Sequence, residues 1–146
     1  MIQDFVHVNI SVSDLDRAIS YYQKLGLEVT KRIGELDSEG VAAAFKLQRG
    51  NLNVVHLRPK NSSGNMRIDL VEWLNPSPQG PTYPALNNLG LVRLAFTVDD
   101  LEKTVEKLRS EGLDFLSDVQ SFGQGITSVV TTDPDGTFIQ LIQGLK

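Results

Sequence analysis

The chain has 146 residues, with 14 Lys and Arg, 18 Asp and Glu and no cysteine. A chain of this length can form one domain with its own hydrophobic core. The lack of cysteine excludes thiolate nucleophiles, iron–sulfur clusters, Cys-ligated zinc and disulfide bonds. The net charge of −4, without a basic cluster, argues against nucleic acid as a partner. We expect a cytoplasmic protein without membrane contact, because long apolar stretches and a secretory start are absent.

An internal repeat organises the chain. Residues 7–15 (HVNISVSDL) and residues 93–101 (RLAFTVDDL) each consist of an alternating strand followed by an acidic helix start. The offset of 86 residues (93 minus 7) continues without a gap to Gly26 and Gly112. Each copy is therefore predicted to begin with a strand, then a short helix, then a glycine that ends the helix.

The two predicted helices each have one apolar face. In the first copy this face comprises Leu15, Ala18, Ile19, Tyr22 and Leu25. In the second copy it comprises Leu101, Val105 and Leu108. We expect Ser13 or Asp14 to cap the first helix and Asp99 the second, because short polar side chains accept hydrogen bonds from open helix N–H groups.

Three strand-like segments follow each helix. After the first helix they are residues 41–48, 52–57 and 67–73, and after the second they are residues 114–117, 127–131 and 137–142. The result is an α+β fold of two βαβββ modules, module 1 over residues 1–74 and module 2 over residues 91–146. The proline-rich segment 75–90 links them. We expect a single domain over 1–146, because neither half alone buries both faces of its sheet.

Side chains alternate across a strand, so each repeated strand has two faces. The apolar faces comprise Val6, Val8, Ile10 and Val12 in the first copy and Val92, Leu94, Phe96 and Val98 in the second. The other faces comprise Phe5, His7, Asn9 and Ser11, and Leu91, Arg93, Ala95 and Thr97. We expect the apolar faces to pack under the helices, which turns His7 and Arg93 toward the opposite, concave side.

Two later strands each place one polar residue on a largely apolar face. Asp69 does so in the segment 67–73, and Gln140 in the segment 137–142. A single polar residue of this kind is usually a core group whose hydrogen bonds are satisfied. Several at repeat-related positions favour a shared cavity instead, lined by His7, Asp69, Arg93 and Gln140.

These motifs resemble the vicinal-oxygen-chelate superfamily of glyoxalases, bleomycin-resistance proteins and extradiol dioxygenases. The resemblance rests on the pattern His-x-x-Ile-x-Val-x-Asp-Leu at 7–15, on its second copy, and on the motif Asp-Pro-Asp-Gly-x-x-Ile-x-Leu at 133–141, near the end of the chain. It implies a cupped eight-stranded mixed sheet with the helices outside, and a homodimer. It also implies that the family's metal-ligand positions are His7, Asp69, Arg93 and Gln140.

Two of these four residues depart from a metal site. Arginine is cationic at any accessible pH, cannot ligate a metal and repels a divalent ion. The dioxygenase branch needs two histidines and a carboxylate around iron, but His7 is the only histidine among the four. We therefore expect a degenerate site without a cofactor, in which His7, Asp69 and Gln140 are the remaining metal-ligand positions.

The first interpretation of the cavity is that Arg93 replaces the metal as its positive centre and binds a small organic anion, together with Gln140. His7 and Asp69 would then be the catalytic acid and base. If the protein is an enzyme, a lyase or isomerase of the glyoxalase type is favoured over a dioxygenase. An ion pair between Arg93 and Asp69, which closes the site, is the structural alternative.

Two other interpretations stay open. In one, the cavity only binds, as in the antibiotic-sequestering relatives, with Trp73 and Tyr83 as aromatic walls and Asn9 among the substrate-binding residues. In the other, His7 and Asp69 recruit one divalent ion (zinc, nickel, manganese or iron) with His56 or Glu72 as a further ligand. The loops at 34–40, 75–90 and 118–125 are expected to rim the cavity and to set the substrate.

Overall fold

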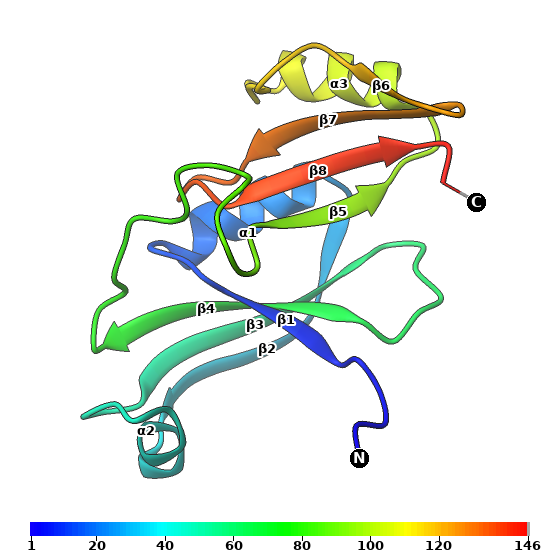
Figure 1. Ribbon diagram of the computed structural model, residues 1–146. Helices are drawn as coiled ribbons and strands as arrows, with labels where there is room; N and C mark the ends of the chain where they lie inside the picture. The colour runs from blue at the N-terminus through cyan, green and yellow to red at the C-terminus, as the bar shows by residue number, and fades with distance from the viewer. Residues whose placement is uncertain (146) are drawn as a thin grey trace. The chain divides into compact units, whose positions relative to one another are not determined.

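Two four-stranded mixed sheets, one in each half of the chain, form the framework of the protein (Figure 1). The computed structural model describes residues 1–145. It divides the chain into two units, Met1–Gly80 and Pro81–Lys146.

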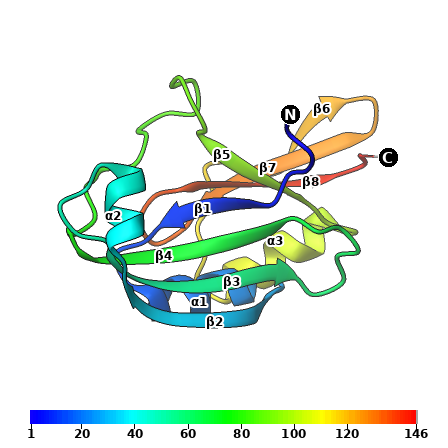
Figure 2. The same ribbon diagram turned by 90° about the horizontal axis from the view of Figure 1, so that it is seen from below.

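The first unit contains four strands and two helices. They are β1 (His7–Ser11), α1 (Leu15–Lys24), β2 (Leu27–Asp37), α2 (Glu39–Phe45), β3 (Asn51–Pro59) and β4 (Arg67–Asn75). The strand order is β1-β4-β3-β2, with β1 parallel to β4 and the other pairs antiparallel, as Figure 2 shows. Helix α1 packs against β2 and β4.

The second unit repeats this topology with one helix. Its elements are β5 (Arg93–Thr97), α3 (Leu101–Ser110), β6 (Gln120–Gly123), β7 (Ile126–Thr132) and β8 (Phe138–Gln143). The strand order is β5-β8-β7-β6, again with the first and last strands parallel. Helix α3 packs against β8.

The strand registers confirm the internal repeat. Asn9 of β1 pairs with Asp69 of β4, and Ala95 of β5 pairs with Gln140 of β8. The offset between the first strands is 86 (95 minus 9), as in the sequence repeat. The two βαβββ modules of the predicted α+β fold are therefore present, and their first strands occupy equivalent positions.

The predicted alternation is confirmed within β1 and β5, but Val6, which precedes β1, is exposed and does not join the apolar face. Ile10 and Val12 are buried, whereas His7, Asn9 and Ser11 are exposed on the opposite face. Strand β5 shows the same division, with its polar face exposed. The helices thus cover the apolar faces, and the polar residues lie on the other side of each sheet.

The helix ends follow the expected chemistry with one correction. Asp14 caps α1 by accepting a hydrogen bond from the Arg17 N–H at 2.9 Å. The cap of α3 is Asp100, not the predicted Asp99, and it accepts from the Lys103 N–H at 3.1 Å. Both helices begin at the leucine of the repeat, so the residue directly before that leucine is the one that caps.

The segment 41–48 is not a strand, contrary to the prediction. Most of it belongs to helix α2, which Ser38 caps and Lys46 ends in the left-handed conformation. The strand prediction followed from Val41 and the apolar residues near it. The three consecutive alanines within the segment favour a helix instead, because alanine has the highest helix propensity. The strand that precedes this helix, β2, was not predicted, because polar and charged residues dominate Leu27–Asp37.

The segment 114–117 is also not a strand. Only Phe115 forms an isolated bridge, to Thr131. Strand β6, not the segment 114–117, pairs with the edge of β7. A tight turn joins the two strands, and its residues Gln124 and Gly125 have φ values of 53° and 78°. Two consecutive residues with positive φ match the twist of a two-residue hairpin, so this local turn sets the pairing of β7.

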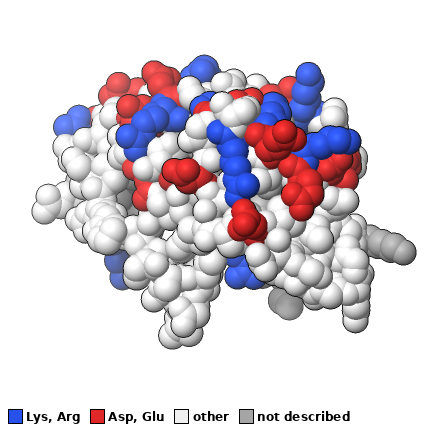
Figure 3. Space-filling view, turned by 90° about the horizontal axis from the view of Figure 1, so that it is seen from above, with Lys and Arg blue, Asp and Glu red and all other residues white. Residues whose placement is uncertain are grey.

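Charges of both signs are interspersed over the face that carries α3 (Figure 3). Lys103 and Lys107 alternate with Glu102 and Glu106 along this helix. None of the helices in the described part of the chain is long and apolar enough to span a bilayer.

Candidate functional site

In the first unit, a buried carboxylate lies on the sheet face opposite α1. Asp69 is 5% exposed, and Arg67, two residues earlier on β4, is on the same face. The Arg67 Nε–H donates to Oδ1 of Asp69 at 2.7 Å, and Nη2 lies 3.4 Å from Oδ2. This ion pair compensates the Asp69 charge within its own strand, because two side chains two residues apart point the same way.

Two histidines flank the same carboxylate. His7 of β1 places Nδ1 3.4 Å from Oδ2 of Asp69 and 3.4 Å from Nη2 of Arg67. His56 of β3, which is directly opposite Asp69 in the register, places Nε2 3.6 Å from Oδ1. Burial lowers the pKa of His56, and the Asp69 charge opposes that effect only in part. His56 is therefore a neutral imidazole at neutral pH.

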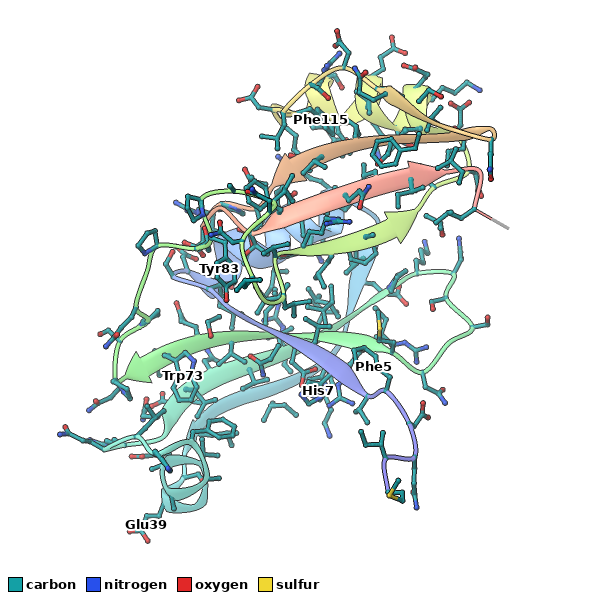
Figure 4. The ribbon with its side chains drawn as sticks, viewed as in Figure 1. Phe5, His7, Glu39, Trp73, Tyr83 and Phe115 are labelled. Atoms are coloured by element: carbon teal, nitrogen blue, oxygen red, sulfur yellow. The ribbon has the colours of Figure 1, made fainter. Side chains whose placement is uncertain are left out.

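Aromatic side chains lie at the other end of this face. The Trp73 Nε1–H donates to Oγ of Ser11 at 3.2 Å, and its ring centroid is 6.3 Å from that of Phe45 in an edge-to-face arrangement. Figure 4 shows Trp73 beside α2 and His7 farther along the unit. Trp73 and Val41 of α2 pack against an apolar cluster of Leu52, Val54 and Val71. Helix α2 thus covers part of the face that carries Asp69.

In the second unit, three polar side chains form a chain of hydrogen bonds. The buried Ser128 hydroxyl donates to the Leu141 carbonyl at 3.0 Å. The Gln140 Nε2–H then donates to Oγ of Ser128 at 2.8 Å. Oε1 of Gln140 accepts from the Arg93 Nε–H, also at 2.8 Å. Arg93 is exposed, yet a buried amide fixes its position.

The two units differ in how their arginine is compensated. Arg67 has the carboxylate of Asp69 as its partner. Arg93 is held by a neutral amide and forms no ion pair within residues 81–145. Within its own unit, Arg93 therefore has no carboxylate that compensates its charge.

The comparisons with known proteins come down to one family. A sequence model described as the Glyoxalase/Bleomycin resistance protein/Dioxygenase superfamily matches residues 4–141. The chain belongs to this superfamily. Among curated proteins, none matches the chain.

Several solved structures share the fold of this chain. A glyoxalase family protein from Bacillus cereus is 24% identical, with a TM-score of 0.87 over 100% of this chain and 97% of its own. The trypanothione-dependent glyoxalase I of Leishmania major is 21% identical, with a TM-score of 0.67 over 97% and 87%. An antibiotic-binding protein from a Streptomyces species is 21% identical, with a TM-score of 0.64 over 99% and 98%.

The superfamily includes metal enzymes, but the donor set of this member does not fit a divalent ion. The Arg67 guanidinium contacts both Asp69 and His7, so a cation already lies where an ion shared by these two residues would bind. Residues 1–145 contain no group of three or more His, Asp or Glu side chains arranged to hold a metal. Glu72, a candidate ligand in the sequence, turns toward α1 and accepts from the Leu15 N–H at 3.3 Å.

The predicted site residues fall into two groups, one in each unit. His7, Asn9, Asp69 and Trp73 lie on one face of the first sheet, where Asn9 pairs in register with Asp69. Arg93 and Gln140 are in direct contact in the second. Tyr83, a predicted aromatic wall, packs over Gly90, where a Cβ atom would lie 3.0 Å from its hydroxyl.

Sequence reasoning missed the roles of Arg67 and Ser128, and it named His56 only as a possible further metal ligand beside His7 and Asp69. Arg67 lies two residues before Asp69 in the same strand, so strand alternation puts both side chains on one face, and this signal could have found it. The facing of His56 depends on the register between β3 and β4, which the sequence does not specify. Ser128 is one hydroxyl within the apolar strand β7, and it carries no sequence signal of its own.

Proposed function

We propose that this member of the superfamily is a small-molecule-binding protein that takes up small organic anions through Arg93. The proposal rests on one observation. Arg93 is fixed by the neutral Gln140 and has no carboxylate partner within residues 81–145. A guanidinium that is held in place but not neutralised attracts an anionic ligand, and a charge-assisted hydrogen bond is the strong kind. We further expect a cytoplasmic homodimer.

Proton transfer at His7 is a second candidate function. The His7 Nδ1 atom faces Asp69 and Arg67, and the His7 side chain is 39% exposed. A carboxylate that orients an imidazole through one nitrogen leaves the other nitrogen to act as an acid or base. This arrangement supports an isomerase or lyase, in which His7 takes a proton from one carbon of a bound substrate and returns it to the neighbouring atom or the leaving group.

The anion-binding proposal is tested with matched ligand pairs. Benzoate and benzamide, and acetate and acetamide, have the same shape but differ in charge. Titrations followed by NMR measure each affinity for the wild type, for Arg93→Met and for Arg109→Met. Arg109 is the control, because it is an exposed arginine of the same unit that already pairs with Asp118 at 2.9 Å.

Arg93→Met is expected to weaken the carboxylates about tenfold, the low end for a charged hydrogen bond because Arg93 is exposed to solvent. The amides and the Arg109→Met variant are expected to be unaffected. Equal carboxylate binding by wild type and Arg93→Met would reject the proposal. If the protein prefers large cationic glycopeptides and Arg93→Met keeps that preference, antibiotic sequestration would be favoured instead. The similar Streptomyces structure is named as an antibiotic-binding protein.

A further inference from the structure

The hydroxyl of Ser128 controls which way the Gln140 amide points. Ser128 is 1% exposed and donates its single hydrogen to the Leu141 carbonyl. A hydroxyl with its proton committed can only accept from a second partner. Ser128 therefore requires the NH2 group of Gln140, not its oxygen, and the 2.8 Å contact from Nε2 meets that requirement.

The fixed amide in turn determines which edge of the Arg93 guanidinium is used. With Nε2 on Ser128, Oε1 of Gln140 faces Arg93 and accepts from its Nε–H. The opposite amide orientation would point NH2 at a cation that only donates. One N–H of Arg93 is thus occupied, and the parallel N–H groups of Nη1 and Nη2 form the remaining fork.

We infer that Ser128 is a positioning residue of the anion site, and that the site is built for a planar carboxylate received by the Nη1–Nη2 edge of Arg93. The inference rests on the proposed anion binding and deepens it. Two parallel N–H donors match the two oxygens of a carboxylate, whereas a phenolate presents one oxygen. Carboxylate is therefore the ligand class that uses the whole fork.

A comparison of the two modules supports this assignment. The register position that Gln140 occupies beside β5 is occupied by Asp69 beside β1. Asp69 neutralises its arginine, whereas the amide of Gln140 holds Arg93 without neutralising it. An acceptor without charge is what a site needs if its cation is to stay available to a ligand.

The test compares affinities for benzoate and for 4-nitrophenolate, a ligand with one anionic oxygen, by NMR titration of the full chain. Ser128→Ala removes the acceptor and releases the amide. The benzoate affinity is expected to fall about fivefold, the effect of one net hydrogen bond, with a smaller change for the phenolate. Arg93→Lys, which keeps the charge but removes the fork, is expected to lose the preference for benzoate.

Thr131→Val is the matched control for Ser128→Ala. Thr131 is another buried hydroxyl of β7, but it donates to the Asp114 carbonyl and does not contact the Arg93 chain. Its loss is expected to lower the melting temperature without changing the benzoate-to-phenolate ratio. Ser128→Thr, which retains the hydroxyl, is expected to keep that ratio.

The outcomes separate this inference from the proposed function. If Arg93→Met leaves benzoate binding unchanged, anion binding at Arg93 is wrong and the inference fails with it. If Arg93→Met weakens benzoate but Ser128→Ala and Arg93→Lys keep the wild-type ratio, only the positioning role and the carboxylate fork are rejected. If Ser128→Ala does not fold, the ratio for Arg93→Lys alone decides whether the fork is used.

Discussion

Arg67 and Asp69 lie two residues apart on β4, and their side chains meet on one face of the sheet with 2.7 Å between Nε and Oδ1. The carboxylate is buried and the guanidinium is only partly exposed. Because of this ion pair, the charge of Asp69 in the first module is compensated by Arg67. The corresponding position of the second module holds Gln140 beside Arg93, and Arg93 has no carboxylate partner within residues 81–145.

The first prediction concerns the stability of this pair. Asp69→Asn removes the charge that compensates Arg67 and is expected to lower the free energy of unfolding by about 2–4 kcal/mol, because one charge is left in a partly buried site. Urea unfolding measures the change. Asp37→Asn is the control, since Asp37 pairs with Arg49 at the exposed surface, where water screens the two charges and the loss of the pair should cost much less. Equal losses in the two variants would show that the buried pair has no special role.

The second prediction concerns metal binding. Wild-type protein is expected not to bind zinc or nickel tightly, because Arg67 holds Asp69. Arg67→Met removes the cation beside His7, His56 and Asp69. These side chains are not arranged as metal ligands in the wild type, but they can turn toward an ion once the guanidinium is gone, and zinc affinity is expected to rise by tenfold or more. Calorimetric titration measures the gain.

Adding His56→Ala to Arg67→Met is the control for this site. The double variant is expected to lose the gained affinity, because three ligands are reduced to two. Tight zinc binding by the wild type that disappears in His7→Ala would contradict the prediction and restore a metal-dependent function.

How much the sequence predicts is clear from individual residues. The repeat and strand alternation correctly placed His7 and Arg93 opposite the helices, because period-two patterning is a local property. They did not reveal that His56 approaches Asp69, because that contact depends on the register of β3 against β4. The spacing of two residues puts Arg67 on the same face as Asp69, but alternation alone does not show that the two charges form an ion pair. The convergence of Asp69 with Arg93 in one cavity stays a prediction.

The third prediction concerns pH. Burial lowers the pKa of His56 below its ordinary value near 6.5. The unfolded chain therefore takes up a proton at this residue before the folded protein does. The contribution of neutral His56 to the free energy of unfolding is fully present above about pH 6.5, and it is lost as the pH falls through the folded pKa. Urea unfolding as a function of pH should show a shallower acid loss in His56→Gln than in the wild type. Identical slopes would mean that His56 is not held neutral by the fold.

The fourth prediction concerns the close packing of helix α2 against Gly50. A Cβ atom at Gly50 would lie 2.6 Å from the Ser38 carbonyl oxygen and 2.8 Å from the Ala42 nitrogen. Gly50→Ala therefore forces the helix away from β3 and is expected to cost about 1–3 kcal/mol of unfolding free energy. Gly80→Ala is the control, because nothing lies within 4 Å of a Cβ atom there. Thermal melting measures the unfolding midpoint of each variant, and similar midpoints would contradict the close packing of α2 against Gly50.

The last prediction tests whether the neutrality of Gln140 keeps Arg93 available. Gln140→Glu changes the shape of the side chain little, but it places a carboxylate against the guanidinium, as Asp69 does against Arg67. The variant is expected to lose about tenfold in benzoate affinity, because its own carboxylate occupies the site. Gln143→Glu is the matched control. Gln143 lies on the opposite face of β8, where its Oε1 accepts from the Leu101 N–H at 2.7 Å, as Glu72 does for Leu15 in the first module. A carboxylate at that helix start is favourable and does not contact Arg93. Benzoate binding that falls equally in both variants would indicate a general effect of added negative charge, and the specific role of Gln140 would be wrong.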